Sequence, residues 1–102
     1  MAITNTVLTT SVANIHVSAG NTIVSTMYFC NLNGSAQSFN LYAVPSGSIA
    51  DVGNQIYKSV LIQPNDTYII DMEKLALGSG DTIRANASVN SAITATVSYL
   101  GI

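Results

Sequence analysis

The chain has 102 residues, the size of one domain, and 48% of them are hydrophobic, which supplies a core and argues against a disordered chain. Only 8% are charged and the net charge is −2, whereas about 25% of an average soluble domain is charged. The few cations are scattered and no run approaches the ~18 apolar residues that span a bilayer, which argues against nucleic-acid binding and membrane insertion.

Short runs rich in Val, Ile, Thr, Tyr and Phe follow one another along the chain, separated by turn-forming residues. Strands are expected at 2–9, 12–18, 22–32, 37–44, 55–63, 67–72, 81–89 and 92–100. About eight short strands without helical crossovers predict an all-β fold, an antiparallel β-sandwich of the jelly-roll or immunoglobulin-like kind. Residues 1–102 are expected to form this single domain, with 1–20 as an N-terminal hairpin or arm.

Three connections carry specific expectations. Asn33-Gly34 lies between two strand-like runs and predicts a two-residue hairpin turn, because both residues tolerate positive φ. Asp66 and Asp81 each follow turn residues, where a carboxylate accepts backbone N–H bonds. Residues 72–77, ended by Gly78, predict a short helical turn that closes one end of the sandwich.

Side-chain alternation distinguishes two kinds of strand. The runs 81–89 and 92–100 alternate between apolar and polar residues, which predicts one buried face and one wet face. The runs 22–32 and 37–44 are apolar on both sides. Within 22–32 one side holds Ile23, Met27 and Phe29, and the other holds Val24, Tyr28, Cys30 and Leu32. Within 37–44, Phe39 and Leu41 lie opposite Tyr42 and Val44.

One apolar face of these two strands is expected to meet the core. The second must be covered by a loop of the same chain or by a neighbouring subunit. The subunit interpretation makes five residues a candidate interface: Val24, Tyr28, Leu32, Tyr42 and Val44.

The distribution of charge also suggests an assembled protein. All charged residues lie between Asp51 and Arg84. A free monomer usually stays dispersed through mixed surface charge, whereas neutral amides and hydroxyls are less costly to bury at an interface. The alternative is simply a Ser/Thr-rich surface, and composition alone leaves both interpretations open.

The sequence shows no constellation of catalytic residues. His16 is the single histidine and has no acid near it in sequence, so it is expected to be an ordinary surface or edge-strand residue. Cys30 is the single cysteine and is expected to be a buried, inert thiol. No catalytic residue, cofactor site or metal site is predicted, and the chain is not expected to be an enzyme.

Tyrosines offer an alternative function. Carbohydrate-binding sandwiches stack sugars on exposed aromatic rings, and Tyr42, Tyr57, Tyr68 and Tyr99 are the candidates. The absence of tryptophan weakens this hypothesis, and core or interface tyrosines are the commoner outcome.

Several segments taken in order resemble a known family. They are 22–32 with Asn33-Gly34-Ser35, 38–45, 66–70, 75–85 and the end at Gly101-Ile102. Their order and spacing, over about residues 20–102, resemble the small β-sandwich virion structural proteins of tailed bacteriophages.

That resemblance implies a viral structural protein at the surface of the particle, most simply a capsid cement or decoration protein that bridges coat subunits. A small tail, neck or baseplate component is the alternative. The implied partners are the major capsid protein or another virion protein, together with further copies of the chain, with a trimer favoured. The family supplies no catalytic residues, and its matching positions Gly80, Asp81 and Arg84 have structural roles. Residues 1–20 depart from the family and are expected to form an extra hairpin or an arm that pairs with a neighbour's sheet edge.

Overall fold

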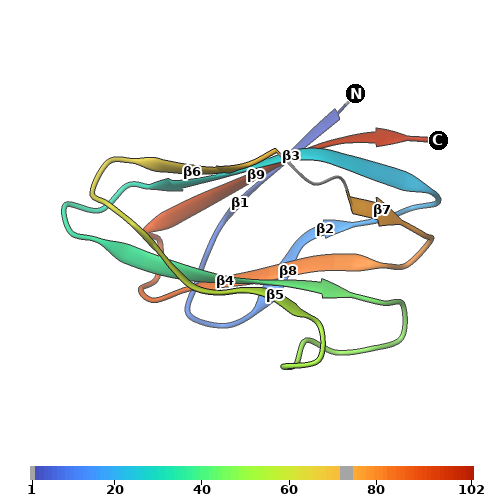
Figure 1. Cartoon of the computed structure of the whole chain (residues 1–102), viewed down its shortest axis with the longest axis horizontal. Coiled ribbons are helices and arrows are strands. Elements are labelled where there is room, and N and C mark those ends of the chain that lie inside the picture. The colour runs from blue at the N-terminus through green and yellow to red at the C-terminus, as the bar shows by residue number, and fades with distance from the viewer. Residues whose placement is uncertain (1, 72–74) are drawn as a thin grey trace.

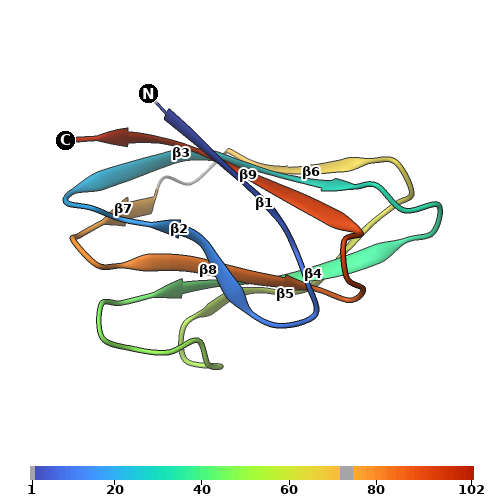
Figure 2. The ribbon, with the colours of Figure 1, turned by 180° about the vertical axis from the view of Figure 1, so that it is seen from behind.

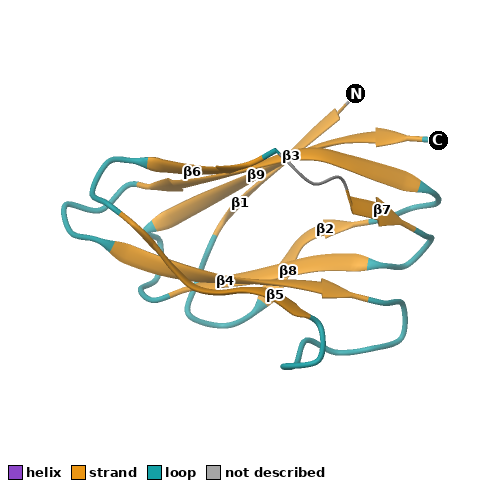
Figure 3. Cartoon of the chain, viewed as in Figure 1, coloured by secondary structure: helices purple, strands orange, loops and turns teal. Residues whose placement is uncertain are grey.

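The chain forms nine β-strands in the computed structural model, which describes residues 2–71 and 75–102 (Figures 1 and 3). The strands are β1 Ala2–Val7, β2 Ala13–Val17, β3 Thr22–Asn31, β4 Gln37–Val44, β5 Gln55–Ile62, β6 Thr67–Ile70, β7 Leu75–Leu77, β8 Thr82–Ala87 and β9 Ile93–Gly101. The described residues contain no helix. The predicted strand positions are confirmed to within a few residues, and one strand, β7, was missed.

The strands form two antiparallel sheets that face each other (Figures 1 and 2). The five-stranded sheet has the order β1-β9-β3-β6, with β7 also paired to β3. The four-stranded sheet has the order β2-β8-β4-β5. The predicted all-β sandwich is confirmed.

The strand pairing distinguishes the two sandwich types left open by the sequence. First pairs with last (β1 with β9), second with second-last (β2 with β8), β3 with β6 and β7, and β4 with β5. If β6 and β7 are taken as one interrupted strand, the chain is a long hairpin rolled into two sheets. This is jelly-roll connectivity.

The core lies between the sheets and is centred on two aromatic rings. Phe29 of β3 and Phe39 of β4 come from opposite sheets and stack with centroids 4.1 Å apart and an interplanar angle of 7°. Both are fully buried. The alternation predicted for the last two strands is confirmed within β8 and most of β9, since the buried apolar residues include Ile83, Ala85, Ala87, Ile93, Ala95 and Val97. Val89, expected on the same side, lies beyond the end of β8 and is 44% exposed.

The prediction of which residues of 22–32 face the core was wrong for Ile23 and Val24. The pairing of β3 with β9 shifts register between Val24 and Thr26, as it does at a β-bulge. An extra residue changes the side-chain phase. Val24 therefore shares the core face with Met27 and Phe29 and is 2% exposed, whereas Ile23 lies on the other side of the strand.

Val44 is covered by the chain itself. It pairs with Thr82, in the phase opposite to that of buried Leu41, so its side chain lies on the outer side of the four-stranded sheet. It is nevertheless only 2% exposed. The second apolar face was expected to be covered either by the same chain or by a neighbouring subunit. At Val44 it is covered by the same chain.

The expected hairpin at Asn33-Gly34 was wrong. β3 and β4 belong to different sheets, so this segment crosses between the layers. Neither Asn33 nor Gly34 has a positive φ. The crossing is held instead by Asn31, whose fully buried side chain accepts a bond from the Asn33 N–H at 2.8 Å.

The helical turn expected over 72–77 was also wrong for residues 75–77, the part of it that the structure describes. Leu75–Leu77 forms β7, an extended strand paired with Thr22, Ile23 and Val24 of β3. Residues 72–74 of that prediction lie outside the described residues. Leu77 is buried in the core, so its apolar side chain fills the sandwich as expected, but from a strand.

The N-terminal region does not form a separate hairpin. β1 pairs with β9 in one sheet and β2 pairs with β8 in the other. Residues 2–17 therefore supply an edge strand to each layer, and the two chain ends lie close together (Figures 1 and 2).

The turn role predicted for Asp81 is confirmed. Its carboxylate accepts the N–H groups of Gly78 and Ser46, each at 2.8 Å. These bonds hold the pKa of Asp81 below its ordinary value. Gly80 beside it has φ +84°, and a Cβ there would lie 2.5 Å from the Ser46 Oγ, so the turn requires glycine.

Candidate interaction surface

The five predicted interface residues do not form one surface. Val24 and Val44 are buried, and Tyr42 is half-buried on the four-stranded sheet, where it pairs with Arg84. Only Tyr28 and Leu32 are both exposed and close in sequence, with 41% and 57% of their surface accessible. The surface expected over 22–44 is therefore reduced to the end of β3.

A larger continuous surface lies on the side of the five-stranded sheet that faces away from the core. The register sets three rows across it, and one of them runs Asn5, Thr96, Tyr28, Ile69. We call the three rows the outer face: Ile3, Ser98 and Thr26; Asn5, Thr96, Tyr28 and Ile69; Val7, Thr94, Cys30 and Thr67.

The first strand has its apolar side chains on the outside. Ile3 and Val7 belong to the outer face and are 64% and 54% exposed. Thr4 and Thr6 pair with inward-facing Val97 and Ala95 and are half-buried on the core side. A sandwich strand normally buries its β-branched apolar residues and exposes its hydroxyls, so β1 is suited to a partner on its outer side.

The outer face is also free of charge. No strand of the five-stranded sheet contains a charged residue. Within the described residues, the strand charges are Lys58 of β5 and Arg84 of β8, both on the other sheet. Sequence reasoning concentrated on 22–44 and missed this face, although the alternation of Ile3, Asn5 and Val7 against two threonines was a usable signal.

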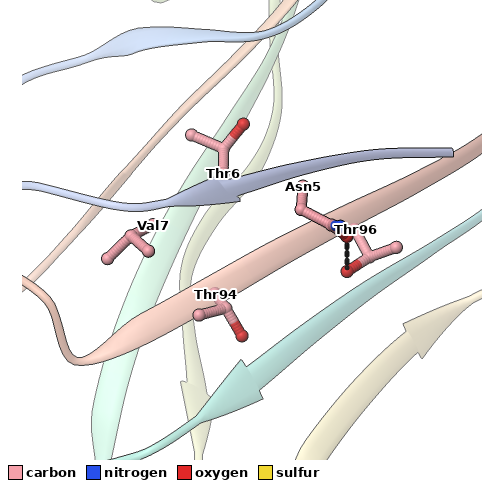
Figure 4. Close-up of a pocket in the computed structure, with 5 residues that line it drawn as sticks. All are labelled: Asn5, Thr6, Val7, Thr94 and Thr96. Atoms are coloured by element: carbon pink, nitrogen blue, oxygen red, sulfur yellow. Dashed lines mark hydrogen bonds between the residues drawn. The ribbon is translucent and has the colours of Figure 1, made fainter.

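A shallow pocket of about 300 Å³ opens where β1 meets β9 (Figure 4). It is lined by Asn5, Thr6, Val7, Thr94 and Thr96, and the Thr96 hydroxyl donates to the Asn5 amide oxygen at 2.9 Å. The lining offers methyl groups and neutral hydrogen-bonding groups. Such a surface suits protein contact, because general acid–base chemistry needs a titratable side chain within reach.

The other residues singled out in the sequence are dispersed. Tyr57 and Tyr99 pack against the core. The Tyr68 ring lies 5.8 Å from that of Phe39 and 6.2 Å from that of Tyr57, edge to face, and Tyr68 is 36% exposed. Cys30 is half-buried on the outer face, where full burial was expected. Within residues 2–71 and 75–102, no three His, Cys, Asp or Glu side chains gather as a metal site requires, and no helix could cross a membrane.

His16 lies on an edge strand, β2, which was one of its two expected placements, but its side chain is not on the surface. The pairing of β2 with β8 shifts register between Asn14 and His16, so both Ile15 and His16 face inward. The ring is 6% exposed and lies 4.3 Å from the Tyr99 ring. Its Nε2 is buried without a hydrogen-bond partner in the described structure, and desolvation lowers the pKa of His16 below its ordinary value of 6.5.

Stability is therefore expected to fall as the pH decreases below 6.5. Below pH 6.5 the histidine of the unfolded chain becomes protonated, whereas His16 in the folded chain stays neutral until a lower pH. The free energy of unfolding is therefore highest above pH 6.5 and decreases as the pH falls towards the pKa of the folded state. A single proton limits the slope to about 1.4 kcal/mol per pH unit. Urea denaturation at pH 7.5, 6.5 and 5.5 measures it.

The chain has one histidine, so His16→Phe is a clean control that keeps a ring against Tyr99. The variant should show a nearly flat profile over this pH range. An equal slope in both proteins would contradict the assignment to His16.

Comparison of the chain with protein-family models, with curated proteins and with solved structures finds no match. The jelly roll by itself does not identify a function, because one fold serves many.

Proposed function

We propose that the chain is a non-enzymatic structural subunit of a bacteriophage particle, a capsid cement or decoration protein that bridges and stabilises coat proteins at the particle surface. Its partners are the major capsid protein, or another virion protein, and further copies of itself, with a trimer as the resemblance favours. A small tail, neck or baseplate component is the alternative placement.

The single observation that carries the proposal is the uncharged outer face. Ile3, Val7, Tyr28 and Ile69 are between 41% and 64% exposed there, interspersed with threonines. Charged residues are depleted and aromatic residues enriched at the centres of protein interfaces. The hydroxyls add hydrogen bonds without the desolvation penalty of ions.

The mechanism is passive. A rigid sandwich presents the outer face to neighbouring coat subunits, and the buried contact holds them together. A specific interface usually buries about 800 Å² on each partner. Many symmetric copies of a modest contact reinforce one another on a particle.

The carbohydrate-binding alternative receives less support. Of its four candidate tyrosines, Tyr57 and Tyr99 pack against the core and Tyr42 is half-buried on the other sheet. Tyr68 is the exposed one, at 36%, and its ring also contacts those of Phe39 and Tyr57. A glycan array with the purified chain tests it directly.

Tyr28→Lys is expected to reduce the number of copies bound per particle by about tenfold or more, because a lysine would be buried unpaired in the contact. Mass spectrometry of particles purified from the phage that encodes the chain measures the copy number. Val17→Lys is the matched control, since Val17 is 55% exposed on β2 of the other sheet. Absence of the wild-type chain from the particles would reject the proposed function. Equal loss by both variants would reject the outer face as the contact.

A further inference from the structure

We infer that β1 pairs with β1 of a second copy of this chain, antiparallel and across a two-fold axis at Asn5, which joins two five-stranded sheets edge to edge. This inference concerns the edge of the sheet, whereas the proposed function rests on its outer face.

Among the described strands, none pairs with the outer edge of β1. β1 is the terminal strand of its sheet, with β9 on one side (Figure 2). The Leu8 N–H bonds the Ile93 carbonyl at 2.8 Å, which fixes the alternation along the strand. In an antiparallel ladder, every second residue directs both backbone groups to the same neighbour. The even-numbered residues therefore bond β9, and Ile3, Asn5 and Val7 direct their N–H and C=O groups to the open edge.

The sequence of β1 is nearly palindromic. Residues 3–7 read Ile-Thr-Asn-Thr-Val. Antiparallel pairing about Asn5 places Asn5 opposite its own copy, Ile3 opposite Val7, and Thr4 opposite Thr6. An apolar residue therefore faces an apolar residue on the outer face, and a threonine faces a threonine on the core side. Cross-strand pairs of these kinds stabilise antiparallel sheets. The residues that direct backbone groups outward also meet each other, so the three odd-numbered pairs form about six hydrogen bonds.

Asn5 fits the axis. Its amide oxygen accepts the Thr96 hydroxyl at 2.9 Å, and an amide oxygen has a second lone pair (Figure 4). The two Asn5 side chains would lie next to each other on the outer face, where each Nδ2 can donate to the other oxygen.

The absence of charged residues near β1 favours a contact between two copies of the chain. A two-fold axis brings identical residues together, so any charge near it would be repelled by its copy. Residues 1–50 contain no charged residue. Natural edge strands commonly carry lysine, proline or a bulge that prevents such pairing. β1 has none of these, and its six residues pair with β9 without a register shift.

The contact is small. A six-residue edge buries less than the about 800 Å² per partner of a standard interface. We therefore expect a concentration-dependent dimer in solution, and a firmer one where the copies are held side by side in an assembly.

Cysteine cross-linking tests the register. In a Cys30→Ser background, Asn5→Cys is expected to give a covalent dimer on mild oxidation, because paired Cα atoms lie about 5.5 Å apart, within disulfide range. Val7→Cys is the matched control and should not link to itself, since its two copies lie about 13 Å apart along the strands. A mixture of Ile3→Cys and Val7→Cys should yield the mixed dimer. Val7→Cys linking as readily as Asn5→Cys, or Asn5→Cys staying monomeric, would overturn the inference.

Sedimentation of the untagged chain over a concentration series gives a second reading. Asn5→Pro removes a backbone donor from the open edge and none from the β9 ladder, so the monomer should keep its fold. Its dimer is expected to disappear at concentrations where the wild type dimerises. A dimer that survives Asn5→Pro at the same concentrations would reject β1 pairing. The proposed function would still stand, because Tyr28→Lys tests the outer face separately.

Discussion

Phe39→Ala is expected to lower the free energy of unfolding by about 3–5 kcal/mol. Phe39 is fully buried, stacks on Phe29 at 4.1 Å and lies near Tyr68, so truncation leaves a cavity where the two sheets meet. Domains of this size are typically stable by about 5–15 kcal/mol. The variant should therefore unfold at a much lower urea concentration, which circular dichroism measures.

Tyr28→Ala provides the comparison. Tyr28 is on the same strand as Phe29, but it is 41% exposed on the outer face, so its loss should change stability by about 1 kcal/mol or less. Phe39→Leu keeps most of the volume and should remain folded if the alanine variant does not. Similar midpoints for Phe39→Ala and Tyr28→Ala would contradict a core centred on the stacked rings.

The sandwich could be predicted because its signals are local. β8 and residues 93–98 of β9 alternate strictly between apolar and polar residues, and a period of two determines which side faces the core. Which jelly-roll strand pairs with which depends on contacts between residues up to the whole chain apart, such as Ala2 with Tyr99. No short-range pattern encodes them.

Three of the predictions that failed involve a change of phase or partner that the sequence does not mark. Bulges next to Val24 and at Ile15 turned Val24 and His16 inward, against simple alternation. Asn33-Gly34 has hairpin chemistry, but the strands on either side belong to different sheets. Val24 left the candidate interface because alternation assumed an unbroken β3. Val44 is covered by the chain itself, and Tyr42 lies on the other sheet.

The buried Asn31 side chain is expected to hold the crossing between the sheets. Its Nδ2 donates to the carbonyls of Ser35 and Ile62, each at 3.0 Å, and its Oδ1 accepts from the Asn33 N–H. Asn31→Ala removes these three bonds, one of them to a buried carbonyl and two to part-buried backbone groups, and the loss of a buried bond costs about 1–3 kcal/mol. We expect a total loss of about 2–4 kcal/mol, measured by urea denaturation.

Asn31→Asp separates hydrogen bonding from packing, since it keeps the shape but replaces the donor with a carboxylate facing two carbonyls. Burial and those carbonyls raise the pKa of the new carboxyl, so the variant should be least stable at neutral pH and recover as the pH falls, when the protonated acid can donate again. The His16 slope runs in the opposite direction, so the comparison is made in the His16→Phe background. Asn33→Ala is the control in the same segment: Asn33 is half-buried, its side chain makes exposed bonds with Ser35, and its loss should change stability by about 1 kcal/mol or less. A loss for Asn31→Ala no larger than that for Asn33→Ala, or an Asp variant that weakens further in mild acid, would show that packing, and not the buried amide, fixes the path from β3 to β4.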